Sequence, residues 1–303
     1  MNKYKAIEKI VDTDRIKYNE PMSKYTTMKV GGPCDAIVFP ESINEIKEII
    51  NYCKEESIKY YVIGNGSNLL VKDEGIHALV IKIGHRFSDI SVNENIITAF
   101  AGASMPSLSQ IAKKNVFKGV EFACGIPGTI GGGVKMNAGA YGSQISDILL
   151  DVTYMDDELN IKTITNKECK FGYRESIFTH NPNYIILSAT FKLEKGNTKE
   201  IETKMKENSF ARKTKQPLEY PNFGSVFKRP EGYFVGKLVD DAGLRGYKIG
   251  DAQVSEKHTG FIVNLGNATC KDILELIEYV QDTVYNKFNV KLTPEVVIIG
   301  GEK

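Results

Sequence analysis

Apolar residues recur at two spacings along the first part of the chain, and these spacings predict its first elements. Between strand-like stretches at 35–40 and 59–64, the segment 42–57 repeats apolar residues at helical spacing. Ser42 and Glu45 at its start have the spacing of a capping box. The apolar face comprises Ile43, Ile46, Ile49, Ile50 and Cys53. We therefore predict a β-α-β unit, which is followed by GNGSNLLV and a further strand at 77–83.

The same patterns predict two further blocks of structure. The second block has strands at 96–103, 147–156, 160–166 and 184–193, a helix from Pro106 to Lys114, and the glycine-rich segment 125–142. A charged helix over 198–213 leads to the third block, which has a strand at 258–265 and a helix opened by Thr269 and Asp272. The apolar stripe of this last helix comprises Ile273, Leu276, Ile277, Val280, Val284 and Phe288. We assign this stripe to a hydrophobic core and not to a cofactor site.

Length and composition indicate a globular protein of more than one domain. With 303 residues, the chain is long enough for two or three domains that each bury a core. Proline and polar residues cluster in QPLEYPN at 216–222, which is typical of a boundary. We expect three parts, 1–90, 91–208 and 209–303.

Charge and targeting signals narrow the class of partner. The 39 basic and 38 acidic residues leave no general attraction to nucleic acid or to an anionic membrane. Any polyanionic ligand must therefore bind at a local site. The N-terminal segment lacks the apolar region of a signal peptide, and no apolar run reaches the length of a membrane span. We expect a cytoplasmic protein that needs no obligate protein partner.

Cysteine and histidine indicate neither a disulfide framework nor a metal site. The five cysteines are odd in number and show no C-x-x-C spacing, and the four histidines are scattered. We expect the cysteines to be small buried residues or bystander thiols.

The segment GIPGTIGGGVKMNAGAYG at 125–142 holds seven glycines in eighteen residues. Such density indicates positive φ angles or a surface that must approach the backbone closely. Its apolar residues and its proline argue against a flexible linker. We therefore predict an ordered loop that lies against a flat or phosphorylated ligand.

Two common phosphate-binding motifs are absent. GNGSNL at 64–69 begins like a dinucleotide fingerprint, but Leu69 replaces the third glycine and a strand follows instead of a helix. The spacing of Gly128 and Gly133 resembles a P-loop, but Val134 follows. What remains is two loops whose N–H groups can form anion-binding nests without a helix dipole, which suits one diphosphate.

Several motifs in a fixed order carry a family resemblance. KYTTMKVGGPC (24–34), GNGSNLLV (64–71) and the glycine-rich segment resemble the flavin-binding segments of the UDP-N-acetylenolpyruvoylglucosamine reductase family, which serves peptidoglycan precursor synthesis. FGYRESIF, ARKTKQP, FGSVFKRP, KLVDDAGLRGYKIGDAQVSEKHTGFIVNLGNAT and LTPEVVIIG are similar to its substrate-side motifs. The resemblance spans nearly the whole chain.

The resemblance implies an α+β protein with a two-subdomain FAD-binding fold of the vanillyl-alcohol oxidase type, at 1–90 and 91–208, and a C-terminal α/β substrate-binding domain at 209–303. It implies non-covalent FAD, NADPH as hydride donor, and reduction of the enolpyruvyl double bond of UDP-N-acetylglucosamine-enolpyruvate to give UDP-N-acetylmuramate. The implied flavin contacts are Tyr25, Thr26, Thr27, Asn65, Gly66, Ser67, Asn68, Leu69, Pro127, Gly128, Thr129, Gly132, Asn137, Gly139 and Ala140.

The implied catalytic residues are Arg174, Ser225 and Glu295, and the reaction explains why these types are needed. A guanidinium suits a substrate carboxylate and the enolate-like charge beside it. Ser225 matches the family's proton donor, and Glu295 belongs to the same proton-delivery set. The implied substrate contacts are Lys215, Arg229 and His258. Without the resemblance, Arg174 reads as a surface ion-pair partner, Ser225 as a turn residue and Glu295 as an edge-strand carboxylate.

The chain departs from the family in two places, and two other functions stay open. FKRP stands where FKNP is common, and Lys135 replaces an aromatic or apolar residue. The chain resembles the shorter subtype, which lacks an inserted tyrosine-bearing loop.

The alternative functions are an FAD-dependent sugar or aldonolactone oxidoreductase of the same fold and a non-catalytic UDP-sugar or flavin sensor. Both fit the three catalytic positions less well.

Overall fold

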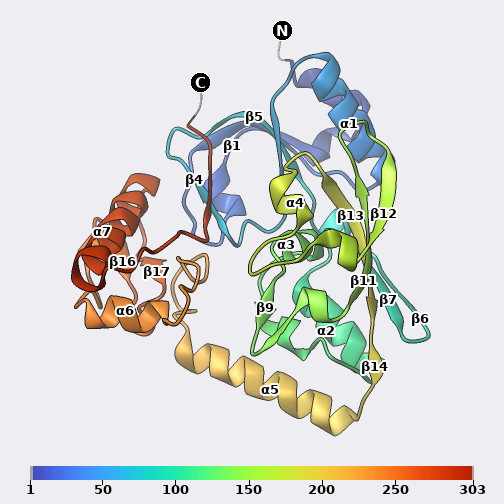
Figure 1. Ribbon diagram of the computed structural model, residues 1–303. Helices are drawn as coiled ribbons and strands as arrows, with labels where there is room; N and C mark the ends of the chain where they lie inside the picture. Colours follow the sequence, from blue (N-terminus) through green and yellow to red (C-terminus); the bar gives the residue numbers. More distant parts are fainter. Residues whose placement is uncertain (1–2, 302–303) are drawn as a thin grey trace. The chain divides into compact units, whose positions relative to one another are not determined.

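The computed structural model describes residues 3–301, which form two compact units (Figure 1). Unit 1 comprises the chain up to Lys17, Ala36–Asn65 and Leu79–Arg212. Unit 2 comprises Tyr18–Asp35, Gly66–Ala78 and the chain from Lys213. The backbone passes between the units several times before Leu79. The division into parts 1–90, 91–208 and 209–303 stays a prediction.

A four-stranded sheet contains the predicted β-α-β elements. Its strand order is β1 (Ile16–Pro21), β2 (Pro33–Val38), β5 (Ile76–Lys82) and β3 (Tyr60–Ile63). Helix α1 (Ile43–Glu55) connects β2 to β3, and β3 runs parallel to β5. The sequence pattern predicts α1 and strands β2, β3 and β5, but it predicts neither β1 nor the position of β5 between β2 and β3.

Helix α1 begins and packs as its sequence predicts. The Ser42 hydroxyl accepts the N–H of Glu45 at 3.1 Å, and Ile46, Ile49, Ile50 and Cys53 are buried. The Glu45 carboxylate also accepts the N–H of Glu41 at 2.8 Å and binds the buried Arg15 guanidinium through two 2.8 Å hydrogen bonds. A buried guanidinium requires such a partner, and the capping-box pattern does not predict it.

Unit 1 is built on a five-stranded antiparallel sheet. Its order is β12 (Ile161–Thr165), β11 (Leu149–Met155), β13 (Ile185–Lys192), β7 (Ile96–Phe100) and β6 (Ile90–Asn93). Four of these strands are predicted from sequence, whereas β6 is not. Besides α1, its helices are α2 (Met105–Lys114), α3 (Ile130–Lys135), α4 (Ile177–His180) and most of α5 (Thr198–Lys215). Its short strand pairs are β8 (Phe117–Lys118) with β14 (Glu194–Lys195) and β9 (Gly139–Ala140) with β10 (Ser143–Gln144).

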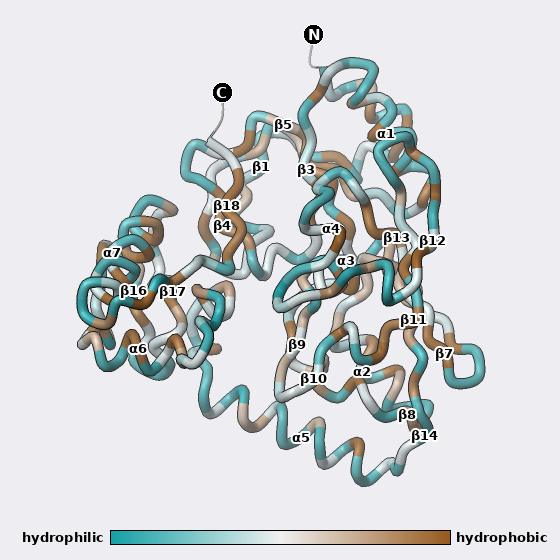
Figure 2. The backbone as a smooth tube through the Cα atoms, viewed as in Figure 1, coloured by the Kyte–Doolittle hydropathy of each residue, from teal (hydrophilic) through white to brown (hydrophobic). Residues whose placement is uncertain are grey.

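Helix α5 is the charged helix predicted before the third block. Figure 2 shows it as mostly hydrophilic, and few of its residues, Ile201 and Met205 among them, are buried. In the described residues, 3–301, no helix has the length and apolarity to cross a membrane. All five cysteines are free thiols, and four of them are buried, as predicted.

Unit 2 has one hydrophobic core, which segments from both ends of the chain share. Its elements are α6 (Val235–Asp241), α7 (Cys270–Phe288), the sheet β15 (Lys248–Ile249), β16 (Ala252–Val254) and β17 (Ile262–Asn264), and the parallel pair β4 (Leu69–Val71) and β18 (Val297–Ile299). The predicted stripe of α7 is buried, with Phe288 partly so. Met28, Val30 and Leu70, from the predicted flavin segments, belong to the same core.

The start of α7 confirms its predicted cap. The Thr269 hydroxyl accepts the N–H of Asp272 at 3.0 Å, and the Asp272 carboxylate accepts the N–H of Thr269 at 2.9 Å. The Asp73 carboxylate accepts two more N–H groups, from Cys270 and Lys271, at 2.8 and 3.0 Å. The loop after β4 is thereby attached to this helix.

Candidate active site

The glycine-rich segment is ordered, but it is not only a loop. Residues Ile130–Lys135 form helix α3, capped by the Thr129 hydroxyl, which accepts the N–H of Gly132. The expectation of a nest without a helix is therefore wrong for this segment. The reason is local, since Thr129 supplies a cap and the apolar residues Ile130 and Val134 are buried.

Several of its glycines are explained by packing within the chain. A Cβ on Gly133 would lie 2.9 Å from the Met105 sulfur, and one on Gly131 would lie 3.1 Å from the Ala101 Cβ. A Cβ on Gly139 would lie 2.7 Å from Gln144 Cβ in the β9–β10 hairpin. Close helix and strand packing therefore accounts for part of the glycine density that the sequence attributes to a ligand.

The two predicted phosphate loops meet within unit 1. A Cβ on Gly64 would lie 2.3 Å from the Thr129 hydroxyl oxygen, and the Asn65 amide donates to the Pro127 carbonyl at 3.1 Å. The Lys82 ammonium donates to the Gly64 carbonyl at 2.7 Å. Burial lowers the pKa of Lys82 to about 8, so this is a half-buried cation at the loop junction. No motif singles out Lys82, because its burial exists only in the folded chain.

Arg174 lies against the end of the glycine-rich segment. Its guanidinium donates to the carbonyls of Asn137 at 3.3 Å and Gly139 at 3.1 Å. Asn137 is buried, and its amide donates to the Gly172 carbonyl at 3.0 Å, so it joins both segments. Unit 1 thus contains the predicted catalytic residue Arg174 and part of the predicted flavin contacts. These contacts are Asn65, Pro127, Gly128, Thr129, Gly132, Asn137, Gly139 and Ala140.

Lys135, whose role the sequence leaves open, has a half-buried side chain. Burial lowers the pKa of its ammonium. Its main-chain carbonyl accepts the hydroxyls of Ser176 and Thr179 at 2.8 and 2.9 Å. The backbone of Lys135 therefore fixes the turn that follows Arg174.

Ser225 and Glu295 lie on neighbouring segments of unit 2. The N–H of Glu295 donates to the Val226 carbonyl at 2.8 Å, and the N–H of Val226 donates to the Gly260 carbonyl at 3.0 Å. The segment that begins at Ser225 is therefore held on both sides, while Ser225 itself is exposed. The Asn222 side-chain oxygen accepts the N–H of Gly224 at 3.0 Å and shapes the turn before Ser225. Asn-x-Gly is a turn signal that could have identified this residue from sequence.

The flavin segments of unit 2 are attached to this pair of segments. The Asn68 amide donates to the Glu295 carbonyl at 3.0 Å, and the Thr27 hydroxyl donates to the Asn222 carbonyl at 2.7 Å. Gly66 has φ +64°, and a Cβ there would lie 2.1 Å from the Tyr25 carbonyl oxygen. Unit 2 thus groups Tyr25, Thr26, Thr27, Gly66, Ser67, Asn68 and Leu69 with Ser225 and Glu295.

The hydroxyls of the two predicted threonines of unit 2 already have partners within the protein. Thr26 is buried and donates to the Val30 carbonyl at 2.9 Å, and Thr27 donates to Asn222. The Tyr25 hydroxyl donates to Glu20 at 3.0 Å. A flavin contact from these residues would therefore use their main chain or accept a hydrogen bond.

The three predicted substrate contacts also lie in unit 2. Lys215 is exposed at the end of α5, and the Arg229 guanidinium lies over the Phe234 ring. The His258 ring nitrogen Nδ1 accepts the N–H of Gly260 at 3.1 Å, and its ring meets Phe261 edge-on. Burial lowers the pKa of His258, which favours neutral imidazole near pH 7.

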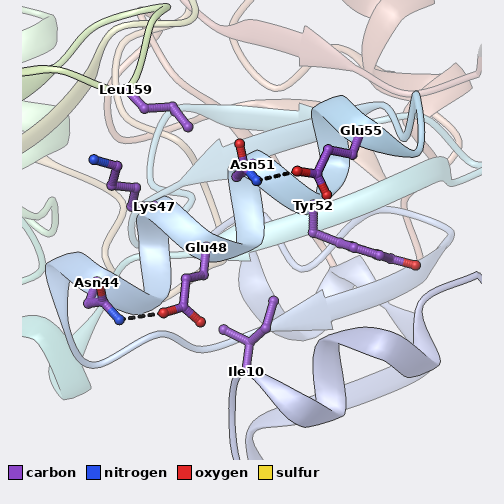
Figure 3. Close-up of a pocket in the computed structure, with 8 residues that line it drawn as sticks. All are labelled: Ile10, Asn44, Lys47, Glu48, Asn51, Tyr52, Glu55 and Leu159. Carbon is purple, nitrogen blue, oxygen red and sulfur yellow. Dashed lines mark hydrogen bonds between the residues drawn. The ribbon is translucent and has the colours of Figure 1, made fainter.

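A surface groove of about 470 Å³ on unit 1 lies apart from all predicted site residues. Figure 3 shows its lining, which consists of Ile10, Asn44, Lys47, Glu48, Asn51, Tyr52, Glu55 and Leu159. Two of its amides, of Asn44 and Asn51, donate to carboxylates one turn later on α1. These are ordinary pairs on an exposed helix face, and we do not assign the groove to the active site.

Comparisons with known proteins agree with the grouping of these motifs. Residues 216–299 match the family model described as the C-terminal domain of UDP-N-acetylenolpyruvoylglucosamine reductase, and residues 33–164 match an FAD binding domain. The UDP-N-acetylenolpyruvoylglucosamine reductase of Alkaliphilus oremlandii is 46% identical over 99% of this chain and 98% of its own length. The chain belongs to the UDP-N-acetylenolpyruvoylglucosamine reductase family. The reductase of this name from Clostridioides difficile is 48% identical, over 96% of this chain and 95% of its own.

A solved structure of the family extends the agreement to three dimensions. The crystal structure of UDP-N-acetylenolpyruvylglucosamine reductase from Thermus caldophilus has a TM-score of 0.80 and 35% identity, and it covers 93% of this chain and 97% of its own. Family membership confirms the predicted fold class, FAD and NADPH as cofactors, and the reductase activity in peptidoglycan precursor synthesis. The roles of the individual site residues stay predictions.

Proposed function

We propose that this reductase acts on UDP-N-acetylglucosamine-enolpyruvate through Arg174, Ser225 and Glu295. The observation that carries the proposal is that two main-chain hydrogen bonds hold the Ser225 and Glu295 segments side by side. The N–H of Glu295 donates to the Val226 carbonyl and the N–H of Lys228 donates to the Thr293 carbonyl, both at 2.8 Å. The acid and the serine thereby lie on one hydrogen-bonded scaffold, as a proton-delivery pair requires.

The residues present fit an FAD diphosphate. Among residues 3–301, the Lys82 ammonium has the Gly64 carbonyl as its hydrogen-bond partner and no carboxylate within ion-pair distance. A half-buried cation of this kind suits a phosphate oxygen. The predicted flavin contacts would hold the cofactor, which when bound supplies the hydride taken from NADPH.

Arg174 supplies the positive charge that the reaction needs. Addition of a hydride to one carbon of the enolpyruvyl double bond places negative charge next to the carboxylate. A guanidinium can bind two carboxylate oxygens and stays protonated, so it stabilises that charge in the transition state more than in the ground state. Its anchoring to Asn137 and Gly139 fixes it before substrate binds.

Ser225 supplies the proton to the adjacent carbon. A serine hydroxyl is a weak acid, so it donates only as that carbon gains carbanion character, and Glu295 on the adjoining segment sets the local charge. The same scaffold holds Asn68, whose amide donates to the Glu295 carbonyl at 3.0 Å.

The two half-reactions test this assignment. We expect Ser225→Ala to leave reduction of the flavin by NADPH nearly unchanged and to slow reoxidation by the enolpyruvyl substrate about 10²-fold or more. Ser225→Cys should retain more activity than Ala, because a thiol can still donate a proton from nearly the same position. Stopped-flow absorbance measures both steps. Equal slowing of both steps by Ala would show that Ser225 shapes the site and that the proton donor is another group.

We also propose that the enzyme works in the cytoplasm without an obligate protein partner. Its nucleotide-sugar substrate and NADPH are cytoplasmic metabolites, which supports the location. Cell fractionation, followed by an activity assay on the purified chain alone, tests both statements.

A further inference from the structure

Ser176 is a buried polar residue that lies outside the predicted site. It follows Arg174 by two positions and is the N-cap residue of α4. The residue is fully buried, and a buried hydroxyl lowers stability unless it is hydrogen-bonded. The Ser176 hydroxyl donates to the Lys135 carbonyl at 2.8 Å and accepts the N–H of Phe178 at 3.3 Å. It therefore acts as donor and acceptor within the protein.

The Lys135 carbonyl is the point at which α4 is attached to α3 (Figure 1). Lys135 is the last residue of α3, where the carbonyls of a helix lack partners in its own ladder. This carbonyl accepts the buried Ser176 hydroxyl and the exposed Thr179 hydroxyl, at 2.8 and 2.9 Å. Water can take the place of an exposed donor more readily than that of a buried one. Ser176 is therefore the more important of the two attachments.

Arg174 lies in a short turn with an anchor at each end. The N–H of Gly172 donates to the Glu175 carbonyl at 3.1 Å, which closes the turn, and Arg174 within it has φ +59°. At the start of the turn, the buried Asn137 amide donates to the Gly172 carbonyl at 3.0 Å. At its end, the Ser176 hydroxyl supplies the second anchor. Both anchors attach the turn to the last residue of α3 or to residues just after it.

The Arg174 guanidinium contacts the same short segment. It donates to the carbonyls of Asn137 and Gly139, while the backbone of its turn is attached to Lys135 and Asn137. Segment 135–139 thus sets both the position of the Arg174 backbone and the orientation of its guanidinium. Loss of one backbone anchor would let the turn shift, and a displacement of about 1 Å can lower a rate about 10²-fold.

We propose that Ser176 is a positioning residue for reduction of the enolpyruvyl double bond. Its hydroxyl holds the Arg174 turn against α3, so that the guanidinium meets the substrate carboxylate in a geometry formed in advance. The inference rests on the proposed function, since Ser176 acts through Arg174. It implies that Ser176 affects only the half-reaction in which the substrate carboxylate takes part.

A double-mutant cycle tests whether Ser176 acts through Arg174. We expect Ser176→Ala to slow reoxidation of the flavin by saturating enolpyruvyl substrate about tenfold and to leave reduction of the flavin by NADPH unchanged. In the Arg174→Lys background, the same substitution should change reoxidation less than about twofold, because the geometry that Ser176 preserves is already lost. Stopped-flow absorbance of the FAD-loaded variants measures both steps.

Ser42→Ala is the matched control, because Ser42 is also an N-cap serine of unit 1, at the start of α1. It should lower the thermal stability, as Ser176→Ala does, but both half-reactions should keep their natural rates. Slowing of reoxidation by Ser42→Ala to the same extent as by Ser176→Ala would overturn the proposal, because loss of stability would then explain both.

Three further results would also overturn it. These are natural reoxidation in Ser176→Ala, equal slowing of both half-reactions by Ser176→Ala, and the same loss of reoxidation rate in both Arg174 backgrounds. If the alanine variant does not fold, Ser176→Cys replaces it in the cycle. A thiol fits nearly the same space but is a weak donor, so reoxidation should slow about threefold, and only where Arg174 is present.

The outcome is separable from that of the proposed function. If Arg174→Lys slows reoxidation but Ser176→Ala does not, only the positioning role of Ser176 is wrong. If Arg174→Lys is reoxidised at the natural rate, the proposed role of Arg174 is wrong, whatever Ser176→Ala shows.

Discussion

At the residue scale, Arg174 combines an uncommon backbone with a fixed side chain. Its φ of +59° lies in the left-handed region, which few non-glycine residues adopt. Its guanidinium reaches the carbonyls of Asn137 and Gly139, and these anchor points leave its plane in a defined orientation. Residues held in such sparsely populated conformations cluster at functional sites.

We predict that Arg174→Lys is not a conservative change. Lysine has a similar backbone preference and keeps the charge, but it loses the two-pronged geometry for a carboxylate. The value of kcat/KM should fall about tenfold or more, with reduction of the flavin by NADPH intact. Steady-state kinetics and stopped-flow reduction measure the two effects. Natural turnover in this variant would mean that Arg174 has a structural role only.

At the element scale, helix termini decide how the predicted helices are attached. Helix α7 receives its own capping box and, in addition, the Asp73 carboxylate from the loop after β4. Helix α1 receives the Ser42 cap and, through Glu45, the Arg15 side chain from the segment before β1. In both cases a carboxylate at the start of a helix connects two segments that are distant in sequence. Asp73 contacts the start of α7 from another segment, and Glu45 lies in the first turn of α1.

Removal of the Asp73 cap should destabilise the protein. Asp73→Ala leaves two N–H groups of the first turn of α7 without this acceptor and removes a negative charge from the positive end of the helix. We expect a loss of about 1–2 kcal/mol in the free energy of unfolding, measured by urea denaturation. Asp73→Asn retains one acceptor oxygen, so its free energy of unfolding should fall less than that of the alanine variant. Equal stability of the alanine variant and the natural protein would refute the role of this cap.

The Arg15–Glu45 pair should make stability depend on acid pH. Burial by itself would raise the pKa of Glu45, but the Arg15 hydrogen bonds and charge and the Glu41 N–H outweigh it, so the pKa is lowered. A lowered folded pKa stabilises the fold above the unfolded value of about 4.3, and that contribution is lost as the pH falls through the folded pKa. Glu45→Gln should cost about 1.5–3 kcal/mol at pH 7. Thermal unfolding should show the difference between the two proteins shrink below about pH 4.

At the scale of the whole molecule, the chain distributes its predicted site between two compact units. Asn65, the segment 127–140 and Arg174 belong to unit 1, whereas the segment 25–27, Ser225 and Glu295 belong to unit 2. Segments 18–35 and 66–78 join the C-terminal third in unit 2, and they share its hydrophobic core. Part of the predicted flavin set is thus folded together with the predicted proton-delivery residues.

We predict that the whole enzyme holds FAD without a covalent bond. The loops GNGSNLLV and VKMNAGAYG contain neither histidine nor cysteine, which are the attachment residues of covalent flavoproteins of this fold. Cys124, nearby in sequence, donates to the Met205 carbonyl, and burial raises the pKa of its thiol, which disfavours the nucleophilic thiolate. Acid precipitation should leave the yellow colour in the supernatant. A yellow pellet would identify a covalent link, with Cys124 the first residue to replace.

The sequence by itself determined the longer helices, most of the strands and the family. Helices α1, α2 and α7 could be predicted because periodicity and caps are local, and a run of residues shows its apolar face whatever lies opposite. The family and its reaction followed from motifs in a fixed order. The candidate residues Arg174, Ser225 and Glu295 came from those motifs, since none has a local pattern that distinguishes it from a surface arginine, a turn serine or an edge carboxylate.

Only the tertiary structure decided strand order, the use of the glycines and the surroundings of the site. The position of β5 between β2 and β3 depends on pairing across the chain, which a local pattern does not contain. Gly131 and Gly133 are explained by neighbours far away in sequence, Ala101 and Met105. Lys82 could be found only in the same way, because burial is a property of contacts and not of residue types.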